Sequence, residues 1–421
     1  MRISLLLKRE PFGPIVEKTL ARFWRAQYGR AYEVRWREGC PGVKALKAAP
    51  GGPGVGEQLW LCNIYLNAFF TPEVNPELFD PIKREFARSV VRWRRPLQRA
   101  YVAMSVWRMG APWMAQANLS VTPSVPDVEN KILVAGNHKL RILDLKARAA
   151  YAISKGEFGN GFLRREVIAR REAARLRLPV PELKSVADDG SWFSESYVSG
   201  TPLNRLADPE SAGRAASRAA RDLFRLLEET AGEEHVSDYC ERLRERIMSH
   251  VEGSHLLSEF DRRQIGRSVK SLAREVDRLR AVAGNRVVTA LAHGDFQPAN
   301  ILSNEDGVWL IDWEYSGRRQ SGYDALVFAL GSRFPEGLSE RLERFVARGL
   351  PESYSIDRLP WPGAGWRDAE GRRLRGALFL LEELLMHLEE NADPCFSRTG
   401  EGLAALRREI DRWASAGRPG E

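Results

Sequence analysis

The sequence predicts an α+β protein with two lobes, a small lobe rich in strands and a larger helical lobe, preceded by an extra N-terminal α/β region. Three observations support this prediction. Alternating apolar runs and a tight turn fall within residues 129–204, and apolar residues at helical spacing dominate from residue 205. A polar motif near residue 293 interrupts the helical part. At 421 residues the chain is long enough to bury more than one core.

The composition argues against several classes of protein. No apolar run approaches the roughly 20 residues that a membrane-spanning helix needs, and the first residues contain too short an apolar segment for a signal peptide. The four cysteines are scattered without a Cys-x-x-Cys pair, which argues against a zinc site or a disulfide framework. We therefore expect a cytoplasmic protein with reduced cysteines.

The net charge of +8 is concentrated in the N-terminal region. Residues 1–128 hold 19 Lys and Arg against 10 Asp and Glu, so the rest of the chain is close to neutral. This excess favours a solvated, arginine-rich face, and the alternative is a surface that contacts an anionic partner. No recognised nucleic-acid-binding motif accompanies the charge, so we expect no nucleic-acid partner.

Residues 1–128 form the first predicted domain, and the sequence does not indicate its role. Residues 11–29 place apolar side chains at helical spacing, and residues 59–66 are typical of a buried strand. Residues 81–95 predict an amphipathic helix packed on the core, with a helix on a membrane surface as the alternative. Two prolines within residues 121–126 disfavour both a helix and a central strand, so we place a domain boundary there.

Residues 129–204 form the second predicted domain, the small strand-rich lobe. Gly136-Asn137 lies between two apolar runs and suits a two-residue turn, because both residues tolerate positive φ angles. A third strand ends at Lys155, a helix is expected over residues 162–176, and a further strand over residues 192–200. The predicted order is three strands, a helix and two more strands.

Residues 205–415 form the third predicted domain, the helical lobe. Helices are predicted over residues 211–231, 256–282 and 372–391. The last of these is strongly apolar and is therefore expected at the centre of the lobe. Residues 351–370, rich in Pro, Gly and Trp, predict a loop on the substrate side, and residues 416–421 predict a flexible tail.

The polar motif in the helical lobe has the spacing of a phosphoryl-transfer site. His293-Gly-Asp295 is followed after four residues by Asn300, and Asp312 ends the apolar run of residues 308–311. Phosphoryl transfer requires a positioned hydroxyl, a clamped triphosphate and Mg²⁺ to neutralise charge. A carboxylate at Asp295 is suited to accept the proton of the hydroxyl, and oxygen atoms of Asn300 and Asp312 are suited to Mg²⁺. His293 is expected to brace the loop, with acid–base chemistry as the alternative.

A lysine and a glutamate in the small lobe complete the expected phosphate site. In the small lobe of a kinase, a lysine on the third strand reaches the α- and β-phosphates, and a helix glutamate holds that lysine in place. Lys155 ends the third predicted strand and Glu166 lies on the following helix, with Glu172 as the competing partner. The hairpin at Gly136 has no G-x-G-x-x-G pattern, so its phosphate-binding signal is weak.

Three motifs resemble those of the aminoglycoside phosphotransferase and choline kinase family: His293-Gly-Asp-Phe-Gln-Pro-Ala-Asn300, Leu310-Ile-Asp-Trp-Glu314 and Gly322-Tyr-Asp-Ala-Leu326. The resemblance covers roughly residues 130–415 and is absent from residues 1–128. The resemblance implies a bilobal protein-kinase-like fold. It also implies ATP, with GTP as an alternative, and Mg²⁺ as cofactors.

The resemblance implies roles in the large lobe. Asp295 would be the catalytic base, Asn300 and Asp312 would hold the metal ions, and His293 would be structural within the loop. Asp324 resembles the aspartate that anchors a helix in this family.

The resemblance also implies nucleotide-binding residues in the small lobe. Lys155 with Glu166 would bind phosphate, and the backbone from Glu195 to Tyr197 would be the hinge that reads the adenine. The sequence departs from the family pattern in two places, the weak phosphate loop and the extra N-terminal region.

The expected function is ATP- and Mg²⁺-dependent transfer of a γ-phosphate to a hydroxyl of a small molecule of the aminoglycoside, amino alcohol or sugar type. Every expected site residue is present, which favours catalysis over the first alternative, a pseudokinase or nucleotide-binding module that acts through its N-terminal region. The second alternative is a kinase of a glycan- or lipid-linked sugar, with the basic region on an anionic surface.

The sequence does not select the acceptor. Four glutamates of the last long helix are expected on a solvated face, and the alternative is a cleft that attracts a cation; they are Glu382, Glu383, Glu389 and Glu390. Trp361 and Trp366 are weak candidates for an aromatic cage around a quaternary ammonium group.

Overall fold

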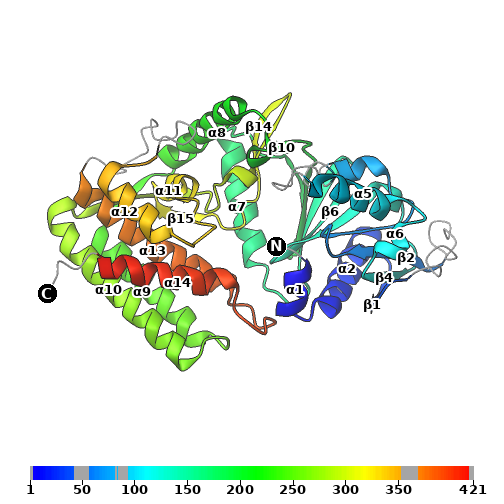
Figure 1. Ribbon diagram of the computed structural model, residues 1–421, viewed down its shortest axis with the longest axis horizontal. Coiled ribbons are helices and arrows are strands. Elements are labelled where there is room, and N and C mark those ends of the chain that lie inside the picture. Colours follow the sequence, from blue (N-terminus) through cyan, green and yellow to red (C-terminus); the bar gives the residue numbers. More distant parts are fainter. Residues whose placement is uncertain (1–2, 42–55, 81–82, 84–92, 352–367, 417–421) are drawn as a thin grey trace. The chain divides into compact units, whose positions relative to one another are not determined.

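The computed structural model describes residues 3–41, 56–80, 83, 93–351 and 368–416 (Figure 1). The chain divides into two compact units. Unit 1 comprises Met1–Arg164 and Pro181–Val198, and unit 2 comprises Arg165–Val180 and Ser199–Glu421. Helices and strands are both abundant among the described residues, which confirms the predicted α+β class.

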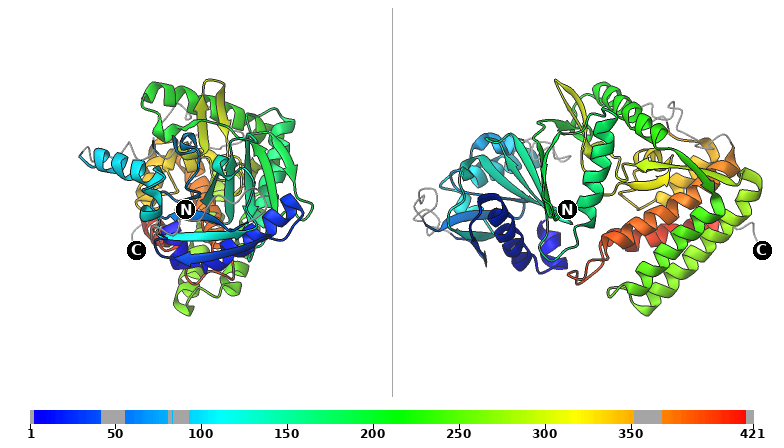
Figure 2. Two further views of the ribbon diagram at one scale, coloured as in Figure 1. Left: turned by 90° about the vertical axis from the view of Figure 1, so that its right-hand side faces the viewer. Right: turned by 180° about the vertical axis from the view of Figure 1, so that it is seen from behind.

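Unit 1 is built around one antiparallel sheet (Figure 2). Its strands are β1 (Glu33–Glu38), β2 (Gln58–Asn63), β3 (Ala68–Phe70), β4 (Ala117–Thr122), β5 (Lys131–Ala135), β6 (Lys139–Asp144), β7 (Ala149–Ser154), β8 (Leu183–Val186) and β9 (Trp192–Ser196). They lie in the order β1-β4-β2-β3-β5-β6-β7-β9-β8. The predicted hairpin is formed by β5 and β6, and the predicted third strand is β7.

Helices cover both faces of this sheet. Successive residues of a strand point to opposite faces, so Trp60 and Cys62 of β2 enter one core while Leu61 enters the other. The first core is completed by α1 (Ile3–Arg9) and α2 (Phe12–Tyr28). The second core is completed by η1 (Pro76–Phe79), α5 (Arg94–Val106) and α6 (Ala111–Met114).

The boundary predicted at residues 121–126 does not divide the compact units. β3 pairs with β5, so strands from both sides of that boundary belong to one sheet. Val121 and Val125 are buried in the same core as α1 and α2. The prolines follow the end of β4, where their missing backbone N–H costs the sheet no hydrogen bond. The chain re-enters the sheet after η2 (Val128–Asn130). The N-terminal region is therefore part of the small lobe's sheet and core.

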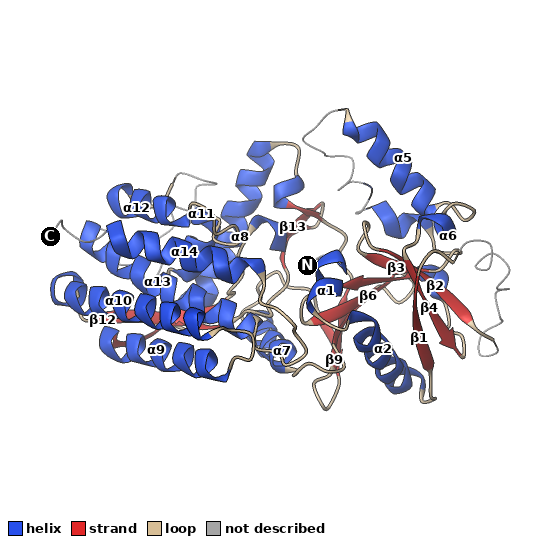
Figure 3. Cartoon of the chain, turned by 60° about the horizontal axis from the view of Figure 1, so that its bottom comes forward, coloured by secondary structure: helices blue, strands red, loops and turns tan. Residues whose placement is uncertain are grey.

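Unit 2 is mainly helical (Figure 3). Its helices are α7 (Gly161–Arg175), which begins in unit 1, α8 (Pro209–Glu229), α9 (Val236–Gly253), α10 (Glu259–Ala283), α11 (Tyr323–Leu330), α12 (Leu338–Arg348), α13 (Ala369–Glu390) and α14 (Glu401–Ala416). Its short strands are β10 (Thr201–Pro202), β11 (Gly232–His235), β12 (Arg286–Ala292), β13 (Ile301–Asn304), β14 (Gly307–Leu310) and β15 (Gly317–Gln320), with turns η3 (Leu203–Arg205) and η4 (Pro298–Asn300). They form two small sheets, β10-β13-β14 and β11-β12-β15.

The central position predicted for the helix over residues 372–391 is confirmed. This helix is α13, which packs against α9, α10, α12 and α14 and is buried over most of its length. The helices predicted over residues 211–231 and 256–282 correspond to α8 and α10. The predictions for residues 81–95, residues 351–370 and the C-terminal tail fall largely outside the described residues. None of the described helices is both long and apolar enough to cross a membrane.

Candidate active site

The loop that carries the predicted motif starts where β12 ends at Ala292 and closes with η4. Gly294 has a φ of +83°, and a Cβ atom there would lie 1.9 Å from the carbonyl oxygen of Tyr315. Only glycine meets both conditions, because it has no Cβ atom and tolerates positive φ. Asp312 adopts a φ of +69°, a conformation that is uncommon for non-glycine residues and concentrates at functional sites.

His293 connects the loop to the segment that precedes Asp312. Its Nδ1 accepts the backbone N–H of Asp295 at 3.2 Å, so its Nε2 carries the proton and donates to the carbonyl of Ile311 at 3.1 Å. Burial lowers the pKa of His293, which favours the neutral ring that this pair of bonds requires. The arrangement suits the bracing role rather than acid–base chemistry.

Asp324 holds the same loop from the start of α11. Its two carboxylate oxygens accept the backbone N–H groups of His293 at 2.7 Å and Gly294 at 2.9 Å. Asp324 is fully buried, and a buried carboxylate needs such donors to offset its lost hydration. The turn before Asp295 is therefore fastened to a helix about 30 residues further along the chain.

Asp295 is buried and receives donors from three side chains. Gln297 Nε2 lies 3.0 and 2.9 Å from its two oxygens, and Asn300 Nδ2 lies 2.6 Å from Oδ2. The third donor is Nε of Arg333. Burial raises the pKa of Asp295, and the Arg333 charge acts in the opposite direction. The carboxylate is thus fixed in orientation and faces a permanent positive charge.

Arg333 is a site residue that the sequence analysis did not identify. Its guanidinium group donates to Asp295, to the carbonyl of Gly294, and to both carboxylate oxygens of Glu383 at 2.9 and 3.1 Å. The side chain of Arg333 is only 15% exposed, so acceptors must replace most of its lost hydration, and two carboxylates do so. No spacing rule could have found Arg333, because it follows the C-terminus of α11 and reaches Asp295 only through the fold.

The solvated face predicted for the glutamates of α13 is wrong for Glu382 and Glu383, which are both 0% exposed. Glu382 accepts hydrogen bonds from Gln320 at 2.9 and 2.7 Å and from the hydroxyl of Tyr239. Glu383 accepts from Arg333. A helix at the centre of a lobe has no solvated face, so its polar residues must be satisfied by neighbouring elements.

Further along α13, Glu389 pairs with Arg165 at 2.8 Å and with Arg246, and Glu390 accepts from the hydroxyl of Tyr315 at 3.4 Å. These acidic groups are engaged by side chains of the protein itself. The alternative of a cation-attracting cleft therefore gains no support from Glu382, Glu383 or Glu389.

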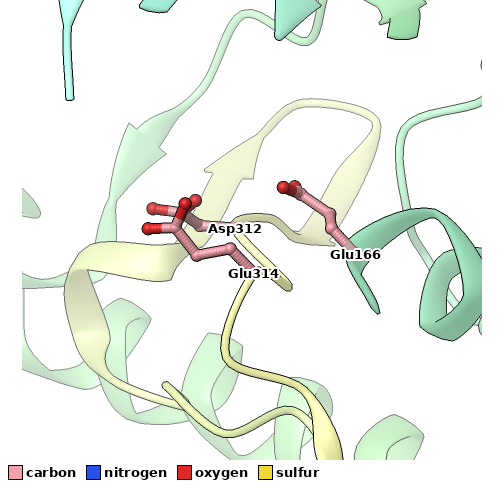
Figure 4. A group of neighbouring side chains, drawn as sticks. All are labelled: Glu166, Asp312 and Glu314. Atoms are coloured by element: carbon pink, nitrogen blue, oxygen red, sulfur yellow. The ribbon is translucent and has the colours of Figure 1, made fainter. Parts of the chain in front are cut away.

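Three carboxylates gather beside the loop of residues 293–300, the candidate catalytic loop (Figure 4). Ligand oxygens of Glu166, Asp312 and Glu314 all lie within 4.8 Å of one another. Figure 4 shows Glu166 reaching from α7 toward Asp312 and Glu314, which come from the segment after β14. Glu166 and Glu314 are buried and Asp312 is half-buried, so their mutual repulsion is poorly screened.

This set of donors fits a hard divalent cation, because Mg²⁺ prefers carboxylate and carbonyl oxygen ligands. Asn300 carries a neutral amide group of the kind that can also bind such a cation. Its amide nitrogen donates to Asp295, so its amide oxygen is the atom left to bind a metal, and its carbonyl accepts the backbone N–H of Ile311 at 3.1 Å. The loop thereby brings Asn300 next to the residue that precedes Asp312.

Lys155 lies in unit 1 directly after β7 and is fully buried. Its Nζ donates to Oε1 of Glu10 at 2.6 Å, and the rings of Phe12 and Phe158 lie 5.9 and 4.9 Å from Nζ. Glu10 was not among the partners that the sequence analysis considered. The competing candidate Glu172 instead pairs with Arg175 at 2.7 Å on the same helix.

The predicted hinge residues lie in and directly after β9, the strand between β7 and β8 in the sheet of unit 1. Glu195 lies in β9, opposite Ala150 of β7 and Leu183 of β8. The backbone N–H of Tyr197 donates to the carbonyl of Arg148 at 3.1 Å. This donor would have to exchange its partner before it could bind an adenine base.

Residues 160–360 match the phosphotransferase enzyme family (APH). The match confirms the resemblance that the motifs predicted and includes α7, the catalytic loop and Asp312. It supports a phosphotransferase activity in general terms. No curated protein matched the sequence.

Several solved structures are similar to the chain at low sequence identity. A choline/ethanolamine kinase family protein from Mesorhizobium loti is 16% identical over 77% of this chain and 95% of its own, with a TM-score of 0.39. A thermostable mutant of the aminoglycoside phosphotransferase APH(4)-Ia, in a ternary complex with AMP-PNP and hygromycin B, is 16% identical over 71% of this chain and 97% of its own, with a TM-score of 0.46. The choline kinase LicA from Streptococcus pneumoniae is 15% identical over 70% and 92%, with a TM-score of 0.37.

Proposed function

We propose that the protein is an ATP- and Mg²⁺-dependent phosphotransferase that transfers the γ-phosphate to a hydroxyl group of a small molecule. The observation that carries the proposal is the arrangement of the catalytic loop. It holds a buried, oriented carboxylate at Asp295 beside an amide and a carboxylate cluster suited to a divalent cation. The match to a phosphotransferase family over residues 160–360 supports the same class of reaction.

In this proposal Asp295 is the group that contacts the acceptor. Its carboxylate orients the hydroxyl and accepts its proton as the oxygen attacks phosphorus. Gln297 and Asn300 fix the plane of the carboxylate, and His293 and Asp324 fix the backbone on which it stands. Positioning of this kind accounts for most of what a protein contributes to phosphoryl transfer.

Asn300, Asp312 and Glu314 are the residues proposed to hold Mg²⁺, with Glu166 as a further carboxylate at the same place. When bound, Mg²⁺ neutralises negative charge on the phosphates during transfer. The residues of the chain bind and orient the reacting groups, and Lys155, directly after β7, supplies a positive charge. Glu195 and Tyr197 remain the proposed hinge for the base.

The acceptor is proposed to be an aminoglycoside, an amino alcohol or a sugar. A nucleotide-binding module without catalysis is the second candidate, because Asp295 already has three side-chain donors of which one is a full positive charge. These two candidates differ in turnover and not in nucleotide binding.

A product screen tests the proposal. The protein is incubated with ATP, with and without Mg²⁺, and with aminoglycosides, amino alcohols and sugars, and each acceptor is analysed by mass spectrometry for the gain of one phosphoryl group. We expect a phosphorylated product from at least one class, and only in the presence of Mg²⁺. Saturable binding of Mg-ATP with no product and no ADP release in any class would overturn catalysis in favour of the binding module.

A further inference from the structure

The turn between α1 and α2 contacts Lys155, whose positive charge is part of the proposed function, and the β5–β6 turn, which the sequence analysis considered as a phosphate-binding hairpin. Arg9 ends α1 and Glu10 follows it. Glu10 accepts a hydrogen bond from Lys155 at 2.6 Å, and both side chains are 0% exposed. Arg9 donates to Oδ1 of Asn137 at 2.9 Å, in the turn between β5 and β6. Two adjacent residues of the N-terminal region thus reach both elements.

Residues of α2 also contact the backbone on either side of Lys155. Gly156 donates its N–H to the hydroxyl of Thr19 at 2.7 Å, and Arg22 donates to the carbonyl of Ser154 at 2.7 Å. A Cβ atom at Gly156 would lie 3.1 Å from Cβ of Lys18, so α2 packs closely against this backbone. Contacts on both sides of Lys155 therefore fix its Cα position relative to α2.

Electrostatics gives Glu10 a role distinct from packing. A buried ammonium group requires an opposite charge within hydrogen-bond distance, and in unit 1 Glu10 supplies one from 145 residues earlier in the chain. A lysine that binds phosphate must be both charged and correctly directed. An anionic partner at 2.6 Å meets both requirements, and the aromatic rings of Phe12 and Phe158 limit the alternative directions of the side chain.

We propose that Glu10 is a positioning residue of the nucleotide-phosphate site: it holds Lys155 in the charged, directed state that binds the phosphates of ATP, while Arg9 braces the β5–β6 turn. This inference rests on the proposed function, because it assumes that Lys155 contacts phosphate. It gives the N-terminal region a part in nucleotide binding through the contact of Glu10 with Lys155.

Calorimetric binding of Mg-ATP and of adenosine, which lacks the phosphates, tests the proposal in the full-length protein. We expect Glu10→Gln to weaken Mg-ATP binding by about tenfold or more and to leave adenosine binding unchanged. Glu17→Gln is the matched control, because Glu17 lies in the same region and accepts a hydrogen bond from the backbone of Trp36 instead. The control is expected to bind both ligands as the unaltered protein does.

A merely structural role predicts a different pattern. If Glu10→Gln weakens Mg-ATP and adenosine binding by the same factor, or neither, the proposal is wrong. The double variant Glu10→Gln/Lys155→Met is expected to bind Mg-ATP no more weakly than Lys155→Met alone, since Glu10 acts through Lys155. A further loss in the double variant would contradict that route.

Hydrogen exchange on the unaltered protein provides a test that needs no substitution, should Glu10→Gln fail to fold. We expect Mg-ATP to protect amides around residues 9–12 and 136–138 beyond the protection that adenosine gives, and equal protection would overturn the inference. Failure of the unaltered protein to bind Mg-ATP would overturn the proposed function and this inference together. Normal binding of Mg-ATP by both the unaltered protein and Glu10→Gln would overturn the inference alone.

Discussion

The loop of residues 293–300 and the site around Lys155 are both held by side-chain hydrogen bonds, but the partners lie at very different distances along the chain. In the loop, Asp295 is contacted by the side chains of Gln297 and Asn300, two and five residues away, and its backbone N–H donates to the ring of His293. At the lysine site, Lys155 is paired with Glu10, which lies 145 residues earlier. Local contacts leave a spacing that can be read from the sequence, whereas a partner recruited from a distant segment leaves none.

This comparison has one exception, because the loop also depends on distant groups. Asp324 and Arg333 contact it from 30 to 39 residues further along the chain. Substitutions in the loop and at its distant contacts measure how much of the site is held locally.

Asp295→Asn tests the most local element. Removing the carboxylate while keeping its shape should lower turnover by about 10³-fold, because the hydroxyl loses its proton acceptor, and Mg-ATP binding should be retained. ATP-dependent product formation and calorimetry measure the two quantities. Asp306→Asn, an exposed aspartate in the β13–β14 turn, is the control and should have no effect. Normal turnover by the Asp295 variant would remove the role proposed for this residue.

Gly294→Ala tests the backbone of the loop. The added Cβ atom would lie 1.9 Å from the carbonyl oxygen of Tyr315, and the alanine would have to adopt an unfavourable positive φ. The free energy of unfolding should therefore fall by more than about 3 kcal/mol. Gly29→Ala is the matched control. Gly29 also has a positive φ, of +67°, but no heavy atom lies within 4 Å of its Cβ position, so only about 1 kcal/mol should be lost. Equal losses in the two variants, measured by denaturant unfolding, would show that the close approach to Tyr315 is unimportant.

Arg333→Gln tests the distant support of the loop. Losing the guanidinium leaves Asp295 and Glu383 buried without their shared counter-charge, so unfolding should become easier by about 3 kcal/mol. We also expect kcat to fall by about tenfold or more, because Asp295 loses one of its three side-chain donors. Arg344→Gln removes an exposed arginine of α12 and should change neither quantity. An unaltered kcat in the Arg333 variant would mean that the loop holds Asp295 without it.

Glu382→Gln tests a buried group outside the loop. Burial raises the pKa of Glu382 from its ordinary 4.5 to about 7, although Arg319 and the hydrogen bonds from Tyr239 and Gln320 oppose this shift. A raised pKa in the folded state stabilises the protein below pH 4.5, and this contribution is lost as the pH rises through about 7. The difference in unfolding free energy between the unaltered protein and the variant should therefore change by on the order of 3 kcal/mol between pH 4.5 and about 8. A difference that does not vary with pH would show that Glu382 ionises normally.

Much of the fold was predictable because its signals are periodic and local. The hairpin around Gly136-Asn137, the strand before Lys155 and the helices α2, α7 and α13 follow apolar periodicity over short windows. The boundary at residues 121–126 was wrongly placed because two prolines end a strand and also separate domains, and only the pairing of β3 with β5 distinguishes these outcomes.

The sequence by itself predicted the general reaction class, phosphoryl transfer, from the order and spacing of His293, Asp295, Asn300 and Asp312. The sequence shows a glycine at position 294 but not the reason for it. The carbonyl oxygen that excludes a Cβ atom there belongs to Tyr315, and only the structure brings it close. Tertiary structure alone decided that Arg333 faces Asp295, that Glu383 is buried, that Glu166 joins Asp312 and Glu314, and that Glu10 pairs with Lys155. Such pairings arise when folding buries a charge and a neighbouring element must neutralise it, and the sequence distance to that element carries no periodic signal.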